Sequence, residues 1–589
     1  MKKENSFVKA GVVLVVSGFV VKILGAVYRI PLTRMLGASL MGRYSAVFSI
    51  FMPFFAFATA GIVPCVSHFS AKNIHSSVRL GGVVKTARGL YILQAFAVAV
   101  AFVAFGYAYS SLRQDDIYFS GAVILAPAII FAVMENICKG VTQGGMDMLP
   151  TAKANVMESV SKAALGLSGV YFAPRFLHGS AGEWQVKAAL GAVTVSGFIC
   201  CVYLLFSTKG GFAVEKHKAE QNSGTKHSKC TGERGKIQQK NTQAPKSTAR
   251  QNSAAIQKDA AKQKCQTKGK SIKTPEGGTV TADGRITAAV MMGMSFPVAV
   301  SALTVSVTGF FDTAVCIPII SRLPYSEIVH SYSGASFKNA GDISIYLLGV
   351  YQGMVISVFN LLPAVLSSVG SASLPVVSRA VAKGDKEYLG YQTERIYRIT
   401  ASLCVPASVY LFVFRSDILG LLFGTNSQQT VVASNLLGIL MAGSVFCCFT
   451  PVFNSVLYAA GKSRRVFGIL LCASAVRCAL NYALCAVAQI NIRSFAVSSV
   501  VFHTIIFILS VTATAKLGIK FPFSKVFLMP CAAAAVSLGA VMLLWNMALC
   551  WLPLILRLVF SGAIYCLVYL LIAFVTGFIL ISPPENSNI

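Results

Sequence analysis

Charged side chains are scarce in this sequence. Of its 589 residues, only 12% are Asp, Glu, Lys or Arg, whereas soluble domains carry about a quarter. Hydrophobic residues make up 55% of the chain, and its mean hydropathy is +0.67. This composition excludes an ordinary soluble domain, and the recurring apolar runs predict an integral membrane protein.

Acidic residues are especially few. The chain has 21 Asp and Glu against 51 Lys and Arg, which gives a formal net charge of +30. Basic proteins often bind nucleic acid, but these cations lie mostly in short connections between apolar runs, where they orient membrane helices. We therefore expect membrane lipids as partners and no nucleic acid.

Cysteine spacing typical of zinc sites or disulfide frameworks is also lacking. The sixteen cysteines lie mostly inside apolar runs, as in Cys200-Cys201 and Cys447-Cys448. Cysteines in such runs behave as small hydrophobic residues. The sequence therefore predicts no metal site and no cofactor.

Long apolar runs are abundant. A membrane-spanning helix needs about 20 mostly apolar residues, and the sequence predicts about fourteen such helices, hence an all-α protein. They lie near residues 8–28, 44–66, 89–109, 119–137, 154–174, 186–206, 286–310, 343–365, 398–420, 432–455, 465–487, 494–514, 525–546 and 554–580.

One long polar segment divides the chain. Residues 207–284 are rich in Lys, Gln, Ser, Thr and Gly, and such a segment buries too little apolar surface to fold. We expect a disordered basic cytoplasmic linker between an N-terminal lobe, residues 1–206, and a C-terminal part, residues 285–589. Cations concentrate in alternate connections, which predicts that both termini of this multi-pass protein are cytoplasmic.

The two parts contain similar segments. Residues 42–72 align with residues 353–383 at a constant offset of 311, with eight identities that include Gly42 with Gly353 and Pro64 with Pro375. Such a repeat predicts two pseudo-symmetric lobes around a central cavity, with a substrate path between them.

These segments resemble a known family. The stretch GAVYRIPLTRMLGASLMGRYSAVFSIFMPFFAFATAGIVPCVSHFSAKN, together with FFDTAVCIPIISRL, LGVYQGMVISVFNLLPAVLSSVGSASLPVVSRAVAKGD and VLYAAGKSRR, is similar to the stage V sporulation protein B group. That group contains polysaccharide-biosynthesis flippases of the multidrug/oligosaccharidyl-lipid/polysaccharide exporter superfamily, which also includes lipid II flippases.

The resemblance implies a flippase of the bacterial cytoplasmic membrane. Its substrate would be a lipid-linked (polyprenyl-pyrophosphate) precursor of the cell wall or of a polysaccharide, carried by alternating access. The resemblance also implies a role in sporulation and cell-wall synthesis enzymes as partners. A cation-coupled multidrug exporter and a non-transporting scaffold for cell-wall assembly are the alternatives. We expect no enzyme, because the long loops lack a cluster of acidic ligands or a nucleophile with its base.

Arginines are the leading candidates for substrate binding. An unsolvated phosphate in hydrocarbon carries a large energetic penalty, and the planar guanidinium group makes two hydrogen bonds to phosphate oxygens. The resemblance points to Arg29 in particular, since arginines of the first helix line the cavity of lipid II flippases. The alternative for these arginines is a position at the helix boundary, facing lipid headgroups. The candidates are Arg29, Arg34, Arg43, Asp312, Arg322 and Arg477.

Other polar residues have structural interpretations. Asp312 is expected either to pair with an arginine across the cleft or to lie in a wet loop. Glu135, Glu158 and Lys162 are expected to form structural pairs near helix ends. Glycine and proline loosen helices, so a gating hinge is predicted at four residues: Gly61, Pro64, Gly370 and Pro375.

Overall fold

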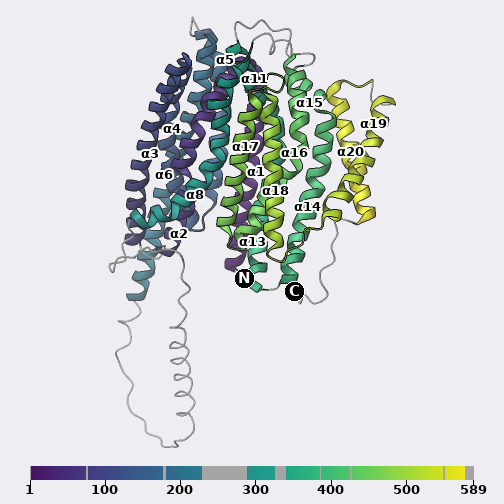
Figure 1. The fold of residues 1–589 in the computed structure, drawn as a ribbon. Helices are drawn as coiled ribbons and strands as arrows, with labels where there is room; N and C mark the ends of the chain where they lie inside the picture. The colour runs from purple at the N-terminus through teal and green to yellow at the C-terminus, as the bar shows by residue number, and fades with distance from the viewer. Residues whose placement is uncertain are drawn as a thin grey trace, which may run out of the picture.

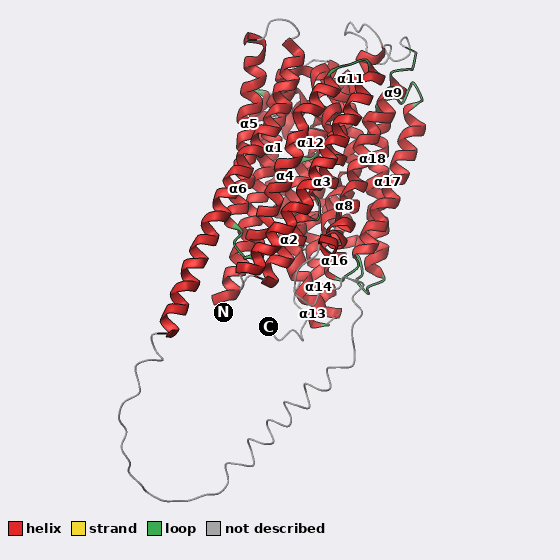
Figure 2. Ribbon diagram, turned by 90° about the vertical axis from the view of Figure 1, so that its left-hand side faces the viewer, coloured by secondary structure: helices red, strands yellow, loops and turns green. Residues whose placement is uncertain are grey.

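The computed structural model describes residues 2–73, 77–176, 181–227, 288–324, 340–384, 386–424, 428–547 and 551–577. In this part of the chain the regular elements are all helices, and most run side by side along one direction (Figures 1 and 2). The first lobe comprises α1 Lys2–Thr59, α2 Ile62–Asn73, α3 Ser77–Arg113, α4 Ile117–Gly144, α5 Leu149–Phe176 and α6 Ala181–His227.

The second lobe contains most of the remaining helices. It comprises α8 Ala288–Phe311, the π-helical turn η1 Asp312–Cys316, α9 Ile317–Ile320, α11 Ala340–Gly349, the π-helical turn η2 Val350–Val355, α12 Ile356–Phe359, α13 Leu361–Lys383, α14 Lys386–Val413, α15 Arg415–Phe423, α16 Gln428–Ala459, α17 Ser463–Cys485 and α18 Arg493–Ala515. Three elements follow and lie beside α14 (Figure 1): η3 Ser524–Leu528, α19 Met529–Met547 and α20 Leu554–Thr576.

Thirteen helices of the described chain are long and apolar enough to cross a membrane, against about fourteen predicted. The first apolar stretch, Ser17–Asn73, contains two of the predicted helices, which meet at the non-helical Gly37. The predicted helix at 343–365 lies across two apolar stretches, Gly341–Phe359 and Leu361–Val381. Helix α5 is 28 residues long but is not among the thirteen. The predicted all-α membrane fold with two lobes is confirmed.

Helix α6 continues through His227, over the first part of the segment predicted as a disordered linker. Extending an existing helix requires no new nucleus, so a polar sequence can continue an apolar helix. Residues 228–287 lie outside the described residues, and the remaining linker boundaries stay predictions.

The two lobes touch each other at small residues. A Cβ atom on Gly349 would lie 1.7 Å from the Ala38 carbonyl oxygen, and one on Gly42 would lie 1.9 Å from the Ile345 carbonyl oxygen. Ala38 and Gly349 are also 311 residues apart, four positions before the two aligned segments begin. Equivalent residues meet where a twofold axis passes between repeats, so this contact marks the pseudo-twofold axis of the two lobes.

A buried apolar core crosses from one lobe into the other. It joins Leu32 and Met41 of α1 with Leu347 of α11 and Val355 of η2, all of which are almost fully buried. Glycine and alanine at the crossing let the helix backbones approach closely, as is typical of packing between membrane helices. The lobes are therefore joined most tightly around α1, α11 and η2.

We predict that Gly349→Val destabilises the protein by about 1–3 kcal/mol, because the added side chain collides with backbone and no flexible side chain can give way. Thermal unfolding of the purified full chain in detergent measures this effect. The control is Gly539→Ala in α19, where an added Cβ meets no atom within 4 Å. Equal melting temperatures for the two variants would contradict the proposed close contact.

Candidate functional site

A polar cavity of about 380 Å³ lies between the two lobes. Helix α1 supplies most of its wall, α5 and α6 contribute Lys162 and Val193, and the second lobe closes it with Gln352, Ile356 and Asn360. Tyrosine and serine hydroxyl groups of α1 add to the polar lining. Two cationic side chains, Arg29 and Lys162, line the cavity, and no carboxylate is among its lining residues. The cavity therefore favours an anionic group.

Arg29 is held at the cavity by a bond between the lobes. Its guanidinium group donates a hydrogen bond of 2.8 Å to the Gln352 carbonyl oxygen. The Arg29 Nε is buried and has no hydrogen-bond partner among the described residues. One donor of this guanidinium thus contacts the opposite lobe, and another is buried without a partner among the described residues.

The π-helical turn η2 provides the acceptors for this contact. A π-helical turn departs from the regular α-helical hydrogen-bond pattern and often marks a functional site. The Gly353 carbonyl accepts hydrogen bonds from Thr33 of α1, at 3.1 Å, and from Ser357, at 2.6 Å. Together with the Gln352 carbonyl, it binds α1 to the second lobe without an ion pair.

Lys162 is a cavity residue that the sequence did not identify. It was expected to form a structural pair with a glutamate, and its charge does act on Glu158, one turn earlier on α5. Glu135 forms an ion pair with Lys139, one turn later on α4. Lys162 lines the same cavity as Gln352 and Asn360 of the second lobe. Lys162 is far from Arg29 in the sequence, so the sequence alone did not indicate that the two cations line one cavity.

The other predicted arginines of α1 lie outside the cavity lining. Arg34 is exposed and donates a 2.6 Å hydrogen bond to the Leu421 carbonyl of the second lobe. Arg43 lies 3.7 Å from the Asp115 carboxylate. Arg322 is exposed just after α9. Arg34 thus links the lobes, and Arg43 belongs to an ion pair within the first lobe.

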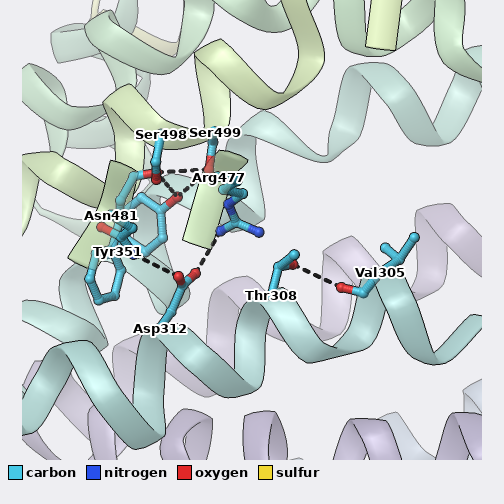
Figure 3. A network of polar contacts seen from close by, with 9 residues as sticks. Val305, Thr308, Asp312, Tyr351, Arg477, Asn481, Ser498 and Ser499 are labelled. Atoms are coloured by element: carbon cyan, nitrogen blue, oxygen red, sulfur yellow. Dashed lines mark hydrogen bonds and ion pairs between the residues drawn. The ribbon is translucent and has the colours of Figure 1, made fainter. Parts of the chain in front are cut away.

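Asp312 is the centre of a buried polar network in the second lobe (Figure 3). Its two carboxylate oxygens accept hydrogen bonds from Arg477, at 2.6 Å, and from Asn481, at 2.7 Å. Asp312 is only 2% exposed, so the predicted wet loop is wrong. The arginine partner was foreseen, but it comes from the same lobe and not from across the cleft.

Tyr351 and Ser499 complete this network. The Tyr351 hydroxyl lies 3.4 Å from the Ser499 hydroxyl and 3.3 Å from the Phe495 carbonyl oxygen, to which it donates. Figure 3 shows these groups gathered on one side of Arg477. The network connects η1, η2, α17 and α18 and keeps the buried carboxylate paired.

The four predicted hinge residues differ in their surroundings. Gly61 has a φ of +83° at the break between α1 and α2, and Pro64 lies in the first turn of α2. A Cβ on Gly370 would lie 2.6 Å from Pro451, so this glycine permits close packing of α13 on α16. Pro375 lies within α13. A role for these residues in gating remains a prediction.

The lobes are closed at the end of the bundle where α11 lies, away from the N-terminus (Figure 1). Here the Tyr109 hydroxyl donates to the Thr313 carbonyl at 3.3 Å, and Arg113 contacts the Ser321 hydroxyl at 3.4 Å. The glycine contacts between α1 and α11 lie at the same end. Passage of a large head group past this point requires the lobes to separate.

A second cavity, of about 630 Å³, lies in the second lobe. It lies between α13, α14 and α20 and is almost entirely apolar, with leucines such as Leu361, Leu403 and Leu570 in its wall. Leu361 of its wall directly follows Asn360 in sequence, and Asn360 lines the polar cavity.

Two family models match the sequence. The model described as "Polysaccharide biosynthesis protein" matches residues 7–221, and the MatE model matches residues 348–483. One match falls on each lobe. No curated protein matches the chain.

Solved membrane-protein structures have the same fold. The inward closed conformation of the lipid II flippase MurJ superposes with a TM-score of 0.64 at 11% identity, over 96% of this chain and 98% of that one. An inward-facing multidrug resistance MATE family transporter of the MOP superfamily gives 0.56 at 12% identity, over 86% and 98%.

A MOP superfamily transporter from Pyrococcus furiosus gives a TM-score of 0.53 at 13% identity, over 86% of this chain and 95% of that one. At these identities the likeness concerns the fold. Together, the family models and the shared fold confirm the resemblance to the multidrug/oligosaccharidyl-lipid/polysaccharide exporter superfamily that the sequence predicted.

Proposed function

We propose that this protein is a flippase that moves a lipid-linked sugar precursor across the membrane by alternating access. The observation that carries the proposal is the cavity between the lobes, which has two cationic side chains and no carboxylate in its lining. A polyprenyl-diphosphate precursor has an anionic diphosphate next to its sugar head. Arg29 and Lys162 would bind that diphosphate.

Arg29 is suited to exchange one partner for another. Its present acceptor, the Gln352 carbonyl, is neutral, whereas hydrogen bonds between guanidinium and phosphate are charge-assisted and about twice as strong. A phosphate reaching Arg29 would therefore displace a contact that joins the lobes. Substrate binding would in this way favour the separation of the lobes that passage requires, because it binds the separated state better.

The apolar cavity of the second lobe supports a lipid-linked substrate. Its wall, formed by α13, α14 and α20, presents mostly apolar surface. The head group would occupy the polar cavity, and the start of the polyprenyl tail would lie in the apolar one. The charged diphosphate would then keep polar partners, and the tail would stay out of water. The MurJ structure, whose fold the chain shares, is that of a lipid II flippase.

A cation-coupled multidrug exporter is the alternative function. Such a transporter needs an available carboxylate inside the bundle to bind a cation. The buried Asp312 has both oxygens occupied by Arg477 and Asn481, and the cavity lining is cationic. The charge of the site therefore favours the flippase, and catalysis is not part of the proposal.

We expect that Arg29→Ala and Lys162→Ala each slow flipping by about 10- to 100-fold, since a hydrogen bond to a charged group contributes about 1.5–3 kcal/mol. The assay is protection of a fluorescent lipid-linked precursor from an external quencher in proteoliposomes. Arg175→Ala, on the same helix as Lys162 but bonded to Tyr171 at the helix end, is the control and keeps wild-type activity.

Two results of this assay would overturn the proposal. One is precursor movement in empty vesicles equal to that with the wild-type protein. The other is full activity of both cavity variants, which would remove the two cations from the binding site. Efflux of a cationic dye without any precursor movement would establish the exporter alternative.

The Asp312–Arg477 pair provides a second test. Arg477→Met leaves a buried carboxylate uncompensated and is expected to destabilise the protein by about 3–5 kcal/mol. Adding Asp312→Asn removes the stranded charge and restores much of the melting temperature, because the pair serves to hold α17 against η1. We predict that the double variant flips the precursor at close to the wild-type rate.

A stable double variant without transport would contradict this prediction, because the pair would then take part in coupling. A double variant that still transports but no longer responds to sodium or pH would identify the coupled cation. The melting temperature of the double variant, measured in parallel, separates these outcomes from a simple loss of fold.

A further inference from the structure

A groove of about 340 Å³ opens between α17 and α18, outside the central cavity. The two helices are antiparallel neighbours, so the start of α17 and the end of α18 lie together. Arg465 in the first turn of α17 and Lys516 directly after α18 line the groove, and Thr512 adds a hydroxyl group. No lining residue of the groove is acidic.

The two cations of the groove are available for an anion. Both side chains are exposed, and neither forms an ion pair with a carboxylate in the described part of the chain. They belong to the basic connections that the sequence places on the cytoplasmic side. An anionic group at this position would thus meet two cations without displacing an existing partner.

The floor of the groove is apolar and lies deeper in the bundle. Ile469 follows Arg465 by one helical turn, and Leu509 and Ala513 precede Lys516 by one or two turns. The space beside Gly468 is open, because an added Cβ there would meet no atom within 4 Å. Charge lies at the helix ends, and apolar surface continues toward the membrane interior.

Both helices also carry exposed apolar residues. Leu471 of α17 and Ile508 of α18 are 49% and 54% exposed. Two cations beside a small apolar groove, on helices with exposed apolar side chains, match the charged headgroup and the apolar part of a phospholipid.

We propose that this groove binds an anionic phospholipid of the cytoplasmic leaflet. Basic residues near the membrane surface attract anionic lipids at about 1 kcal/mol each, and the groove adds an apolar contact that a generally basic surface lacks. A free phosphate would use only the two cations. None of the residues that line the central cavity comes from α17 or α18, so the site is independent of the proposed transport function.

The position of the groove gives the bound lipid a structural consequence. The same two helices carry Arg477, Asn481 and Ser499, which belong to the network around Asp312. A lipid that contacts both helices at once stabilises their pairing, and ligands that bind only the folded state raise the melting temperature. Anionic lipid should therefore stabilise the second lobe.

The experiment measures lipid binding to the purified full chain by native mass spectrometry and by thermal unfolding in detergent, with phosphatidylglycerol or phosphatidylcholine added. We expect phosphatidylglycerol to raise the melting temperature more than phosphatidylcholine does. In Arg465→Ala/Lys516→Ala, binding of phosphatidylglycerol should weaken about thirtyfold, because two basic contacts are lost.

The matched control is Arg464→Ala/Lys520→Ala, which removes the same charge from exposed neighbours that do not line the groove. This control should keep wild-type binding, and both double variants should melt like the wild type in phosphatidylcholine, which excludes misfolding. Equal weakening in the two double variants would overturn the proposal in favour of general surface charge. Equal stabilisation by glycerol phosphate, which has no acyl chain, would overturn it in favour of a simple anion site.

Discussion

A charged group inside a membrane protein must have a partner, and this requirement organises the region between the two lobes. The first helix carries Lys22, Arg29 and Arg34, and each contacts an oxygen of the second lobe: the Ser367 hydroxyl, the Gln352 carbonyl and the Leu421 carbonyl. All three acceptors are neutral. The lobes are therefore held together by cations that an anionic ligand can bind more strongly, and binding and opening are linked through the same side chains.

The repeat places this charged region next to a tight apolar contact. Ala38 and Gly349 meet at the pseudo-twofold axis, where no room remains for a further carbon atom. The turn η2 follows Gly349 directly and presents the carbonyl groups that bind α1. Close packing at the axis thus fixes the distance at which Arg29 reaches the second lobe, and it positions the cavity wall formed by Gln352 and Asn360.

Hydrophobic length and the repeat were enough to predict the membrane fold and its two lobes, since both depend on properties read directly from the sequence. Arg29 lies in the cavity lining and its role in substrate binding stays a prediction. Arg34 and Arg43 lie outside the lining because neighbours on a helix point in different directions. Lys162 and the Arg477 partner of Asp312 are far from their neighbours in sequence. Only the packing of helices from different parts of the chain brings such residues together.

The most direct test of the account is a structure of the full chain in lipid nanodiscs with a bound polyprenyl-diphosphate sugar. The account predicts density for the diphosphate within hydrogen-bonding distance of the Arg29 guanidinium and the Lys162 ammonium groups, with Arg29 released from the Gln352 carbonyl. A ligand bound elsewhere, with the contact between Arg29 and Gln352 unchanged, would contradict it.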